Sequence, residues 1–345
     1  MFDNKENTSL DKIGEFGLID LITKSVELKE KSTVKGIGDD AAVIAHDQMQ
    51  TLISTDLLLE GIHFDLRYVP LKHLGYKAVQ VNLSDIYAMN GIASQITFSI
   101  GLSSKFPLEA VEEIYEGALL ACKKYHVDLI GGDTSASRQG LVISVTSIGY
   151  ASAEQVTYRN GAEEGDLICV SGDLGGAYVG LQLLEREKQI FLENPNIQPD
   201  LEGKDYIVER QLKPEARKDI VELFAELTIK PTAMIDVSDG LASEVLHICK
   251  QSAKGCRIYE DKIPIDPMTY DTAREFGLDP TVCAFNGGED YELLFTIKQA
   301  DYDKIKNNPL ITVIGYITEE KAGCHLISKS EQLHPITAQG WNAFN

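Results

Sequence analysis

Six short acidic motifs recur along the chain, and each is predicted to lie where a strand meets a turn or a helix. They are Gly36-Ile37-Gly38-Asp39-Asp40-Ala41, Ser54-Thr55-Asp56, Asn82-Leu83-Ser84-Asp85, Gly131-Gly132-Asp133-Thr134, Asp236-Val237-Ser238-Asp239-Gly240 and Gly287-Gly288-Glu289-Asp290-Tyr291-Glu292. Carboxylates gathered at element ends repel one another unless cations lie between them. Mg²⁺ is typically held by a few carboxylates together with substrate phosphates. The pattern therefore favours a site that binds several metal ions and handles polyphosphate.

The net charge of the chain argues against some classes of binding partner. The chain has 345 residues, which favours two domains, and a net charge of −21. Nucleic acids and anionic membranes bind basic surfaces, so neither is expected as a partner. A phosphate substrate stays possible because bound metal reverses the local charge.

Cysteine usage and the chain start favour a cytoplasmic protein. The six cysteines form no C-x-x-C pair and are expected to be buried free thiols, as in a reducing cytosol. Residues 1–10 are polar and lack the apolar stretch of a signal peptide. No apolar run reaches the roughly 20 residues of a membrane span.

Hydrophobic periodicity predicts a mixed α/β domain over residues 1–150. Helices are expected at 10–26, 71–89 and 107–125, and strands at 41–45, 51–54, 95–102, 129–130 and 141–150.

A second α/β domain is expected over residues 151–345. Its predicted strands lie at 166–171, 233–236, 256–259, 292–297 and 312–317, and its predicted helices at 175–187, 214–227 and 240–251. The polar segment 188–206, with Pro195 and Pro199, is predicted to be a mobile excursion. The fold class is therefore α/β (α+β) with two domains.

The first motif resembles a dinucleotide-binding fingerprint, but we reject that interpretation. The fingerprint places pyrophosphate at a helix N-terminus, whereas here two aspartates occupy the turn and a strand follows. Taken alone, this segment is also typical of a surface turn. Together with the other five motifs, metal ligation is the better hypothesis.

Asp85 is the most specific single candidate for a residue that binds a metal ion or another cation. Leu74, Ala78, Val81, Asp85 and Ala88 follow helical spacing, so Asp85 shares a face with apolar residues. An unpaired carboxylate there is costly, which predicts a metal or cationic partner. The alternative is a hydrogen-bonded structural aspartate.

The remaining acidic motifs each allow two interpretations. Ser54-Thr55-Asp56, predicted at a strand end, is suited to supplying part of the ligands of a Mg²⁺ ion or to capping a helix or turn. In Gly131-Gly132-Asp133, the glycines allow close approach of a ligand, although a solvated turn is the alternative. Asp236 and Ser238 are predicted on one side of their segment, suited to metal and phosphate contacts, while Asp239 suits a helix cap.

Three further residues are candidates for substrate contacts. Glu289 is suited to a polar substrate group or a cation, or to a solvated turn. His63 is either structural or a phosphate contact, and Arg159 either a phosphate contact or a surface side chain. The chain contains no G-x-x-x-x-G-K-[ST] loop, no protein-kinase motif set and no H-E-x-x-H motif.

The ordered motif set resembles the thiamine-monophosphate kinase family. The resemblance rests on Gly-Ile-Gly-Asp-Asp-Ala, Ser-Thr-Asp with Gly-Ile-His-Phe, Asn-Leu-Ser-Asp, Gly-Gly-Asp-Thr, Arg-Asn-Gly-Ala, Asp-Val-Ser-Asp-Gly-Leu and Gly-Gly-Glu-Asp-Tyr-Glu-Leu, and it runs from about Gly14 to Trp341. It implies the two-domain fold of the aminoimidazole ribonucleotide synthetase-like superfamily and a homodimer formed through the N-terminal sheets. It also implies ATP-dependent phosphorylation of thiamine phosphate to thiamine diphosphate.

The resemblance also implies roles for individual residues. Several Mg²⁺ ions would be held by Asp40, Ser54, Thr55, Asp56, Asp85, Asp133, Asp236 and Asp239. ATP would be bordered by Tyr115, Gly132, Asp133, Arg159 and Ser238. Thiamine phosphate would contact His63, Glu289 and Trp341, the last being the only tryptophan and suited to stacking on a cationic ring.

The chemistry fits an aspartate-rich site. The acceptor is already an ionised phosphate oxygen, so no strong general base is required, and metal ions address the repulsion between two anions. Direct in-line transfer without a phosphoenzyme is expected.

Two rival hypotheses remain. One is another superfamily enzyme, although selenophosphate synthetase and the hydrogenase-maturation dehydratase use reactive terminal cysteines, whereas the first cysteine here is Cys122 and the chain ends Ala343-Phe344-Asn345. The other is a non-catalytic protein that binds divalent cations or nucleotides. Release of ADP that depends on thiamine phosphate separates both from a kinase.

Overall fold

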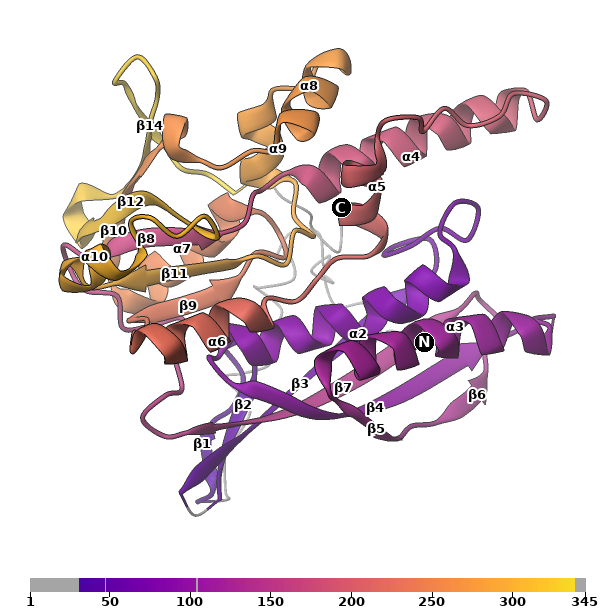
Figure 1. The fold of residues 1–345 in the computed structure, drawn as a ribbon, viewed down its shortest axis with the longest axis horizontal. Helices are drawn as coiled ribbons and strands as arrows, with labels where there is room; N and C mark the ends of the chain where they lie inside the picture. Colours follow the sequence, from indigo (N-terminus) through magenta and orange to yellow (C-terminus); the bar gives the residue numbers. More distant parts are fainter. Residues whose placement is uncertain (1–30, 47, 104, 339–345) are drawn as a thin grey trace, which may run out of the picture.

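Two sheets, each covered by helices, make up the protein (Figure 1). The computed structural model describes residues 31–46, 48–103 and 105–338. The predicted helix at 10–26 lies outside these ranges. Within the described ranges, the first sheet has strand order β1-β2-β3-β7-β4-β5, with β6 paired to β4, and the second has order β14-β13-β10-β12-β8-β11-β9.

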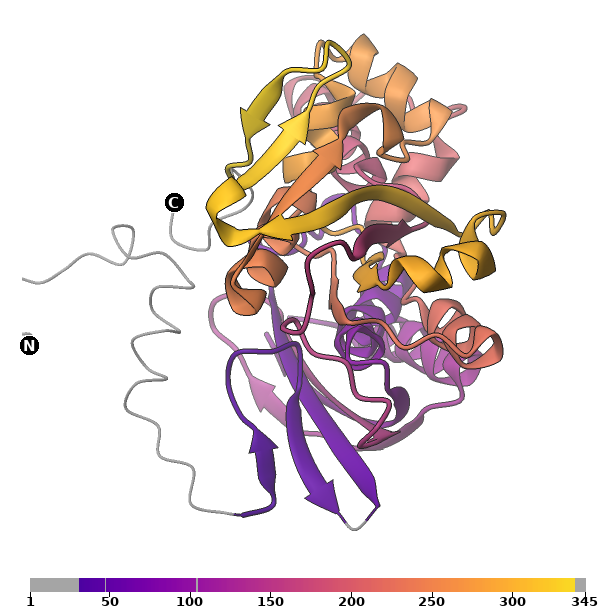
Figure 2. The ribbon, with the colours of Figure 1, turned by 90° about the vertical axis from the view of Figure 1, so that its left-hand side faces the viewer.

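The N-terminal half forms the first sheet and two long helices. The strands are β1 (Thr33–Lys35), β2 (Ala42–His46), β3 (Met49–Leu59), β4 (Ile92–Leu102), β5 (Asp128–Gly131), β6 (Thr134–Ala136) and β7 (Val142–Ser152). The helices are α2 (Leu71–Ala88) and α3 (Leu108–Tyr125). Both helices cover the same face of the sheet, as Figures 1 and 2 show.

The C-terminal half forms the second sheet, which is mostly antiparallel. The strands are β8 (Leu167–Ser171), β9 (Ala233–Asp236), β10 (Lys254–Tyr259), β11 (Leu293–Ile297), β12 (Ile311–Glu319), β13 (Cys324–Ile327) and β14 (Leu333–Pro335). The helices are α4 (Gly176–Glu193), α5 (Asp205–Leu212), α6 (Lys218–Leu227), α7 (Leu241–Ser252), α8 (Pro267–Glu275), α9 (Pro280–Asn286) and α10 (Tyr302–Ile305). Three single-turn helices, η2 (Glu260–Lys262), η3 (Gln299–Asp301) and η4 (Glu320–Ala322), complete it.

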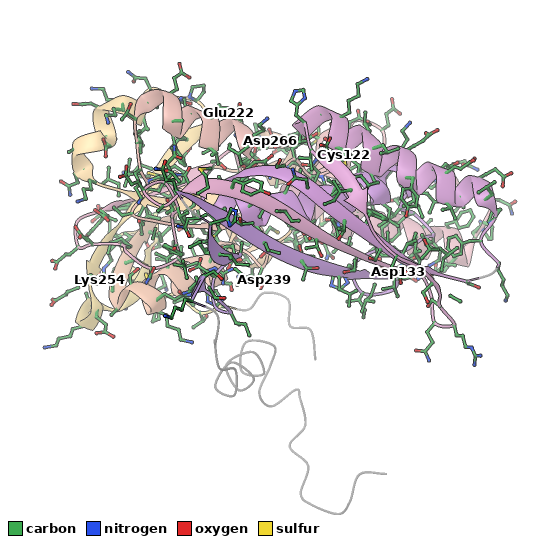
Figure 3. The ribbon with its side chains drawn as sticks, turned by 90° about the horizontal axis from the view of Figure 1, so that it is seen from below. Cys122, Asp133, Glu222, Asp239, Lys254 and Asp266 are labelled. Carbon is green, nitrogen blue, oxygen red and sulfur yellow. The ribbon has the colours of Figure 1, made fainter. Side chains whose placement is uncertain are left out.

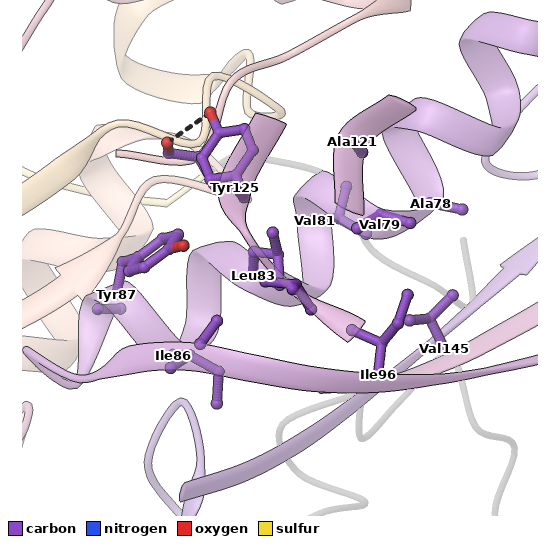
Figure 4. Packing of buried hydrophobic residues seen from close by; sticks show 14 of the residues in the cluster. Ala78, Val79, Val81, Leu83, Ile86, Tyr87, Ile96, Ala121, Tyr125 and Val145 are labelled. Atoms are coloured by element: carbon purple, nitrogen blue, oxygen red, sulfur yellow. Dashed lines mark hydrogen bonds between the residues drawn. The ribbon is translucent and has the colours of Figure 1, made fainter. Parts of the chain in front are cut away.

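Helix α2 is the element that joins the two halves. Leu83 and Ile86 pack with Ile96 and Val145 of the first sheet in the region drawn in Figure 4. The same hydrophobic cluster continues into the second half through Phe224 and other residues of α6, β9 and β11. A helix enclosed on several sides must be apolar around most of its circumference, which explains why polar residues within α2 mark the site rather than a solvent face.

The fold class is as predicted, but several element boundaries differ. The motif Ser54-Thr55-Asp56 lies in the middle of β3 rather than at a strand end. The motif Asn82-Leu83-Ser84-Asp85 lies inside α2, in agreement with the helix predicted at 71–89. The helix predicted at 214–227 begins only at Lys218. The strands β1, β6, β13 and β14 and the helices α5, α8, α9 and α10 were not predicted.

The predicted excursion at 188–206 is also shorter than expected. Helix α4 continues to Glu193, and α5 already begins at Asp205. Lys188 is held by ion pairs with Asp65 (3.3 Å) and Glu185, so its side chain points back to the body of the protein. A polar sequence was therefore mistaken for a break in the helix.

Candidate active site

A cleft of 1380 Å³ is lined by residues of both halves of the chain. Most of the predicted site residues line it, namely Asp40, Ser54, Thr55, Asp56, His63, Asp85, Arg159, Asp236, Ser238, Asp239 and Glu289. The tertiary structure therefore brings together residues that are separated by up to about 250 positions in the sequence.

Three carboxylates form the centre of the cleft. One oxygen each of Asp40, Asp85 and Asp236 lies within 4.8 Å of the other two, and we call this group the carboxylate cluster. Asp40 comes from the loop before β2, Asp85 from α2 and Asp236 from the last position of β9. Three separate elements thus place one acid each at the same point.

Neighbouring side chains hold each member of the carboxylate cluster in place. Ser54 donates a hydrogen bond from its hydroxyl to Asp85, and Ser84 donates one to Asp236 over 2.6 Å. Arg159 binds Asp40 through two parallel hydrogen bonds of 2.9 Å. The guanidinium is therefore engaged with a carboxylate, which orients Asp40.

Burial of several acids disfavours their charged forms. It raises the pKa of Asp85 and of Asp236 well above the ordinary value, and the neighbouring carboxylates raise both further. Burial also raises the pKa of Asp56 and of Asp39 to about 6. An oxygen-only donor set with this excess of negative charge fits hard divalent cations such as Mg²⁺.

The motif on α2 contributes three different interactions. The side-chain oxygen of Asn82 accepts a hydrogen bond from the backbone N–H of Asp56 (3.0 Å). Two residues further, Ser84 donates its hydroxyl to Asp236, and the next residue, Asp85, supplies a carboxylate of its own. The helix thereby fixes β3 and β9 relative to each other at the cleft.

The alternation of β3 separates Thr55 from its two neighbours. Side chains alternate between the two faces of a strand, so Ser54 and Asp56 share the face that α2 covers. Thr55 donates its hydroxyl to the carbonyl of Val145 (3.0 Å) and accepts a hydrogen bond from Thr146 (3.1 Å). Its hydroxyl is thus occupied along the sheet, although the residue lines the cleft.

Glu289 sits in a turn that packs against the second half of the Asp236–Gly240 motif. Its carboxylate accepts hydrogen bonds from Lys77 (3.1 Å) and Gln211 (2.8 Å), and its backbone N–H donates to Ser238 (2.7 Å). At Gly288, φ is +73° and a Cβ would come within 2.5 Å of the carbonyl oxygen of Ser238, so glycine is required there. The turn is therefore rigidly attached to the Asp236–Gly240 motif on one side of the cleft.

His63 is held in a defined tautomer. Its Nδ1 accepts a hydrogen bond from the backbone N–H of Leu59 (3.0 Å), and burial lowers the pKa of the imidazole. The neutral ring therefore carries its proton on Nε2 and is suited to donating a hydrogen bond.

Three predicted ATP-binding residues do not line this cleft. Tyr115 packs against the ring of Phe98 at 5.2 Å between centroids. A Cβ at Gly132 would lie 1.8 Å from the carbonyl oxygen of Phe98, so this glycine serves close backbone packing. Figure 3 shows exposed Asp133 well apart from Asp239. Trp341 lies outside the described residues.

Several residues of the site were missed by sequence reasoning. Lys77 is buried and follows the same stripe of α2 as Asp85, eight residues before it, which is the signal that could have revealed it. Asn82 and Ser84 stand out only as polar residues within an apolar helix. Gln211 and Lys188 gave no signal, because they reach the site from elements whose position the sequence does not reveal.

The two-domain fold around this acidic cleft defines an AIR synthase related protein. The family model for the N-terminal domain of AIR synthase related proteins matches residues 38–151, and that for the C-terminal domain matches residues 163–325. Solved structures of the hydrogenase-maturation protein HypE share the fold alone: the HypE–HypF complex has a TM-score of 0.68 at 16% identity, covering 93% of this chain and 99% of that chain.

Relatives with higher identity define the family more narrowly. Thiamine-monophosphate kinase of Bacillus subtilis (strain 168) is 36% identical over 340 residues, covering 96% of this chain and 99% of that protein. The corresponding protein of Aquifex aeolicus (strain VF5) is 34% identical, covering 97% and 99%. The structure of AaThiL complexed with AMPPCP and TMP has a TM-score of 0.83 at 32% identity, covering 99% and 100%. The chain belongs to the thiamine-monophosphate kinase family.

Proposed function

We propose that this protein transfers a phosphoryl group from ATP to thiamine phosphate and so produces thiamine diphosphate. Family membership supports this reaction, and the similar solved structure holds AMPPCP together with TMP. The observation that carries the proposal is the carboxylate cluster, in which three acids from three elements meet in one cleft. The same cleft also contains His63 and Glu289, the two described residues predicted to contact the thiamine substrate.

Mg²⁺ is the metal ion that the donor set favours. Asp40, Asp85 and Asp236 would hold it, with Asp56 and Asp239 beside them in the cleft. When bound, the ions would neutralise the negative charge of the donor and acceptor phosphates. Ser54 and Thr55 donate their hydroxyl protons to Asp85 and to the carbonyl of Val145, and each hydroxyl oxygen keeps a lone pair that would be available to a cation.

The protein's own residues bind and orient the two anions. Arg67, Lys188 and Lys250 line the cleft and would supply positive charge to bound phosphates, although Arg67 and Lys188 are also paired with Asp65. His63 donates from Nε2 toward a phosphate oxygen, and Glu289 orients the thiamine end. Because the acceptor oxygen is already ionised, positioning suffices for in-line transfer without a general base.

Nucleotide contacts by Arg159 and Ser238 remain part of this proposal. Both residues line the cleft, although Arg159 is paired with Asp40. Contacts of ATP with Tyr115, Gly132 and Asp133 are proposed from the family resemblance, as is stacking of Trp341 on thiamine.

We also propose a homodimer formed through the uncovered face of the first sheet. Large apolar side chains are exposed there on β3 and β4, the two strands that flank β7, including Leu57 (51% exposed), Met49 (45%) and Ile92 (43%). Burying such a patch against a second copy is favourable. We also propose a division into two domains after residue 150, which is supported by the change from the first sheet to the second sheet after β7, a strand that ends at Ser152.

A cytoplasmic location without nucleic-acid partners is proposed on the net charge of −21 and on the free thiols. In the part of the chain that the structure describes, none of the helices combines the length and apolar character needed to cross a bilayer.

The decisive experiment measures ADP release from ATP and Mg²⁺ with and without thiamine phosphate. Release that requires thiamine phosphate, with thiamine diphosphate as the product, supports the kinase. The matched control for Asp85→Asn is Asp128→Asn, because Asp128 is an exposed acid on β5 outside the cleft. Binding of ATP without any turnover dependent on thiamine phosphate would favour the second candidate, a nucleotide-binding or cation-binding protein.

A further inference from the structure

Three of the six cysteines meet in the second half of the molecule, outside the cleft. Cys249 lies in α7, Cys256 in β10 and Cys324 at the start of β13. Their sulfur atoms all lie within 4.8 Å of one another, and we call this group the thiol cluster. Cys256 and Cys324 are directly opposite in the parallel β10–β13 pair, while α7 packs over β10. None of the three lines the active-site cleft.

Ordinary core packing accounts for the other three cysteines but not for this convergence. Cys122, Cys169 and Cys283 are buried in separate places, where free cysteine behaves as a small hydrophobic residue. The thiol cluster instead joins three potential thiolates from three elements at one point. Such convergence is characteristic of a ligand set for a soft metal ion.

The spacing of the sulfur atoms is close to that of a three-thiolate site. A metal ion bound at roughly 2.3 Å to three sulfurs in one plane requires sulfur–sulfur distances of about 4 Å. The sulfurs of the thiol cluster are at most 4.8 Å apart, so small side-chain rotations bring them to bonding distance. No rearrangement of the strands is needed.

The backbone around the thiol cluster is held by a cation. Arg257 donates hydrogen bonds to the carbonyl oxygens of Cys256 (2.7 Å), Gly323 (2.8 Å) and Ala322 (3.1 Å). The backbone N–H of Cys256 also donates to the Gly323 carbonyl (3.2 Å). These bonds fix β10 and the start of β13 relative to each other.

The solvent exposure of the thiol cluster and the number and type of its ligand atoms indicate which kind of metal ion it would bind. Cys249 and Cys256 are buried, whereas Cys324 is only partly buried and gives an entry path. Among the described residues, no fourth histidine, cysteine or carboxylate joins the thiol cluster. Sulfur-only coordination excludes Mg²⁺ as the natural occupant and suits thiophilic ions.

We propose that the thiol cluster is a binding site for a thiophilic d¹⁰ cation, Zn²⁺ or Cu⁺. The bound ion ties the C-terminal part of α7 to β10 and β13. Its role is structural, since α7 begins directly after the Asp236–Gly240 motif and the ion secures the opposite end of that helix.

The test uses the full chain, purified under reducing conditions and freed of metal. Titration with Co²⁺ as a spectroscopic substitute for Zn²⁺ is expected to give sulfur-to-cobalt charge-transfer absorption that saturates at roughly one ion per chain. Zn²⁺ then displaces the signal. A parallel titration with Cu⁺ against a chromogenic chelator determines which of the two ions binds more tightly.

Matched variants assign the signal to the thiol cluster. Cys256→Ser and Cys324→Ser are each expected to weaken Co²⁺ binding at least tenfold, a loss of about 1.4 kcal/mol. Cys122→Ser, a buried cysteine of the other half, is the control and is expected to leave binding unchanged. Because Cys324 is partly exposed, its variant is the one least prone to misfolding.

A measurement on the wild-type protein avoids reliance on variants. Zn²⁺ is expected to protect Cys324 from alkylation, read by mass spectrometry of the peptide that contains it. The proposal is overturned if neither Co²⁺ nor Cu⁺ binds, if the control variant loses binding equally, or if neither Zn²⁺ nor Cu⁺ protects Cys324 from alkylation. A disulfide within the thiol cluster of the freshly isolated protein also overturns it.

Discussion

At the scale of single residues, the carboxylate cluster is expected to lower the stability of the metal-free protein, because its acids repel one another, while it supplies the ligands needed for activity. Asp85 is partly buried, and desolvation together with the neighbouring Asp56, Asp236 and Asp40 raises its pKa well above the ordinary value. Such a position is costly in the absence of cations and useful only when they bind. Replacing such an acid by a neutral residue is therefore expected to lower activity and to raise the stability of the metal-free protein.

Replacing Asp85 by asparagine is expected to separate these two effects. Thiamine-phosphate-dependent ADP release should fall at least roughly 100-fold, because a ligand of the metal is lost. The melting temperature of the metal-free protein should stay the same or rise by a few degrees, since repulsion is relieved. Full activity in a folded Asp85→Asn protein would remove the carboxylate cluster from the mechanism.

The raised pKa values predict a specific pH dependence of stability without metal. Asp56 has a folded-state pKa of about 6, raised by burial above its unfolded value near 4. The folded state therefore holds this proton more tightly, and the contribution to stability present below pH 4 is lost as pH rises through about 6. In EDTA, Asp56→Asn should match wild type at pH 4 and melt higher at pH 8.

Adding Mg²⁺ provides the control for this pH effect. The advantage of Asp56→Asn at pH 8 should shrink or reverse when Mg²⁺ is present, because the ion stabilises the ionised wild-type carboxylate. Equal melting curves for both proteins across the pH range would show that Asp56 is not desolvated in solution.

At the scale of elements, the sequence predicted the bounds of the long helices α2 and α3 correctly, but it did not predict how far the strands extend. The bounds of α2 and α3 agree with prediction within about one residue, because each long helix repeats its apolar positions over several turns. The polar motif Ser54-Thr55-Asp56 was taken for a strand end, although the ladder with β7 continues through it. Polar residues within a strand that lines the site have the composition of a turn, so the sequence alone does not distinguish the two.

The α2–α3 contact depends on two glycines. A Cβ on Gly117 would lie 1.8 Å from the Lys72 carbonyl oxygen, and one on Gly75 would lie 1.8 Å from that of Ile114. The helices therefore touch through their backbones. Gly117→Ala is expected to lower the free energy of unfolding by roughly 2–3 kcal/mol, measured by urea denaturation.

The neighbouring residue supplies a matched control for this substitution. Glu116 forms an exposed ion pair with Lys72 (3.0 Å), so Glu116→Ala should change stability by no more than about 0.5–1 kcal/mol. If both variants are equally stable, the close contact of α2 and α3 does not exist in solution.

At the scale of the whole molecule, the uncovered face of the first sheet is the expected dimer interface. Leu57 on β3 is 51% exposed on this face. Leu57→Asp is expected to convert the dimer to a monomer in light scattering, because a charge cannot be buried at an apolar interface. Leu192→Asp, at an exposed position near the end of α4, is the control and should leave the dimer intact. A monomeric wild-type protein contradicts the proposal.

The sequence by itself determined the family, the fold class and most of the acidic residues of the site. Motif order and apolar periodicity are local properties, so they can be read without coordinates. Only the tertiary structure decided which acids meet: it brought Asp40, Asp85 and Asp236 together and kept Tyr115, Gly132 and Asp133 away from that cleft. It alone also revealed that Lys77 and Gln211 hold Glu289, and that three cysteines converge. Contacts between distant segments depend on how α2 packs between two sheets, and no local pattern encodes that arrangement.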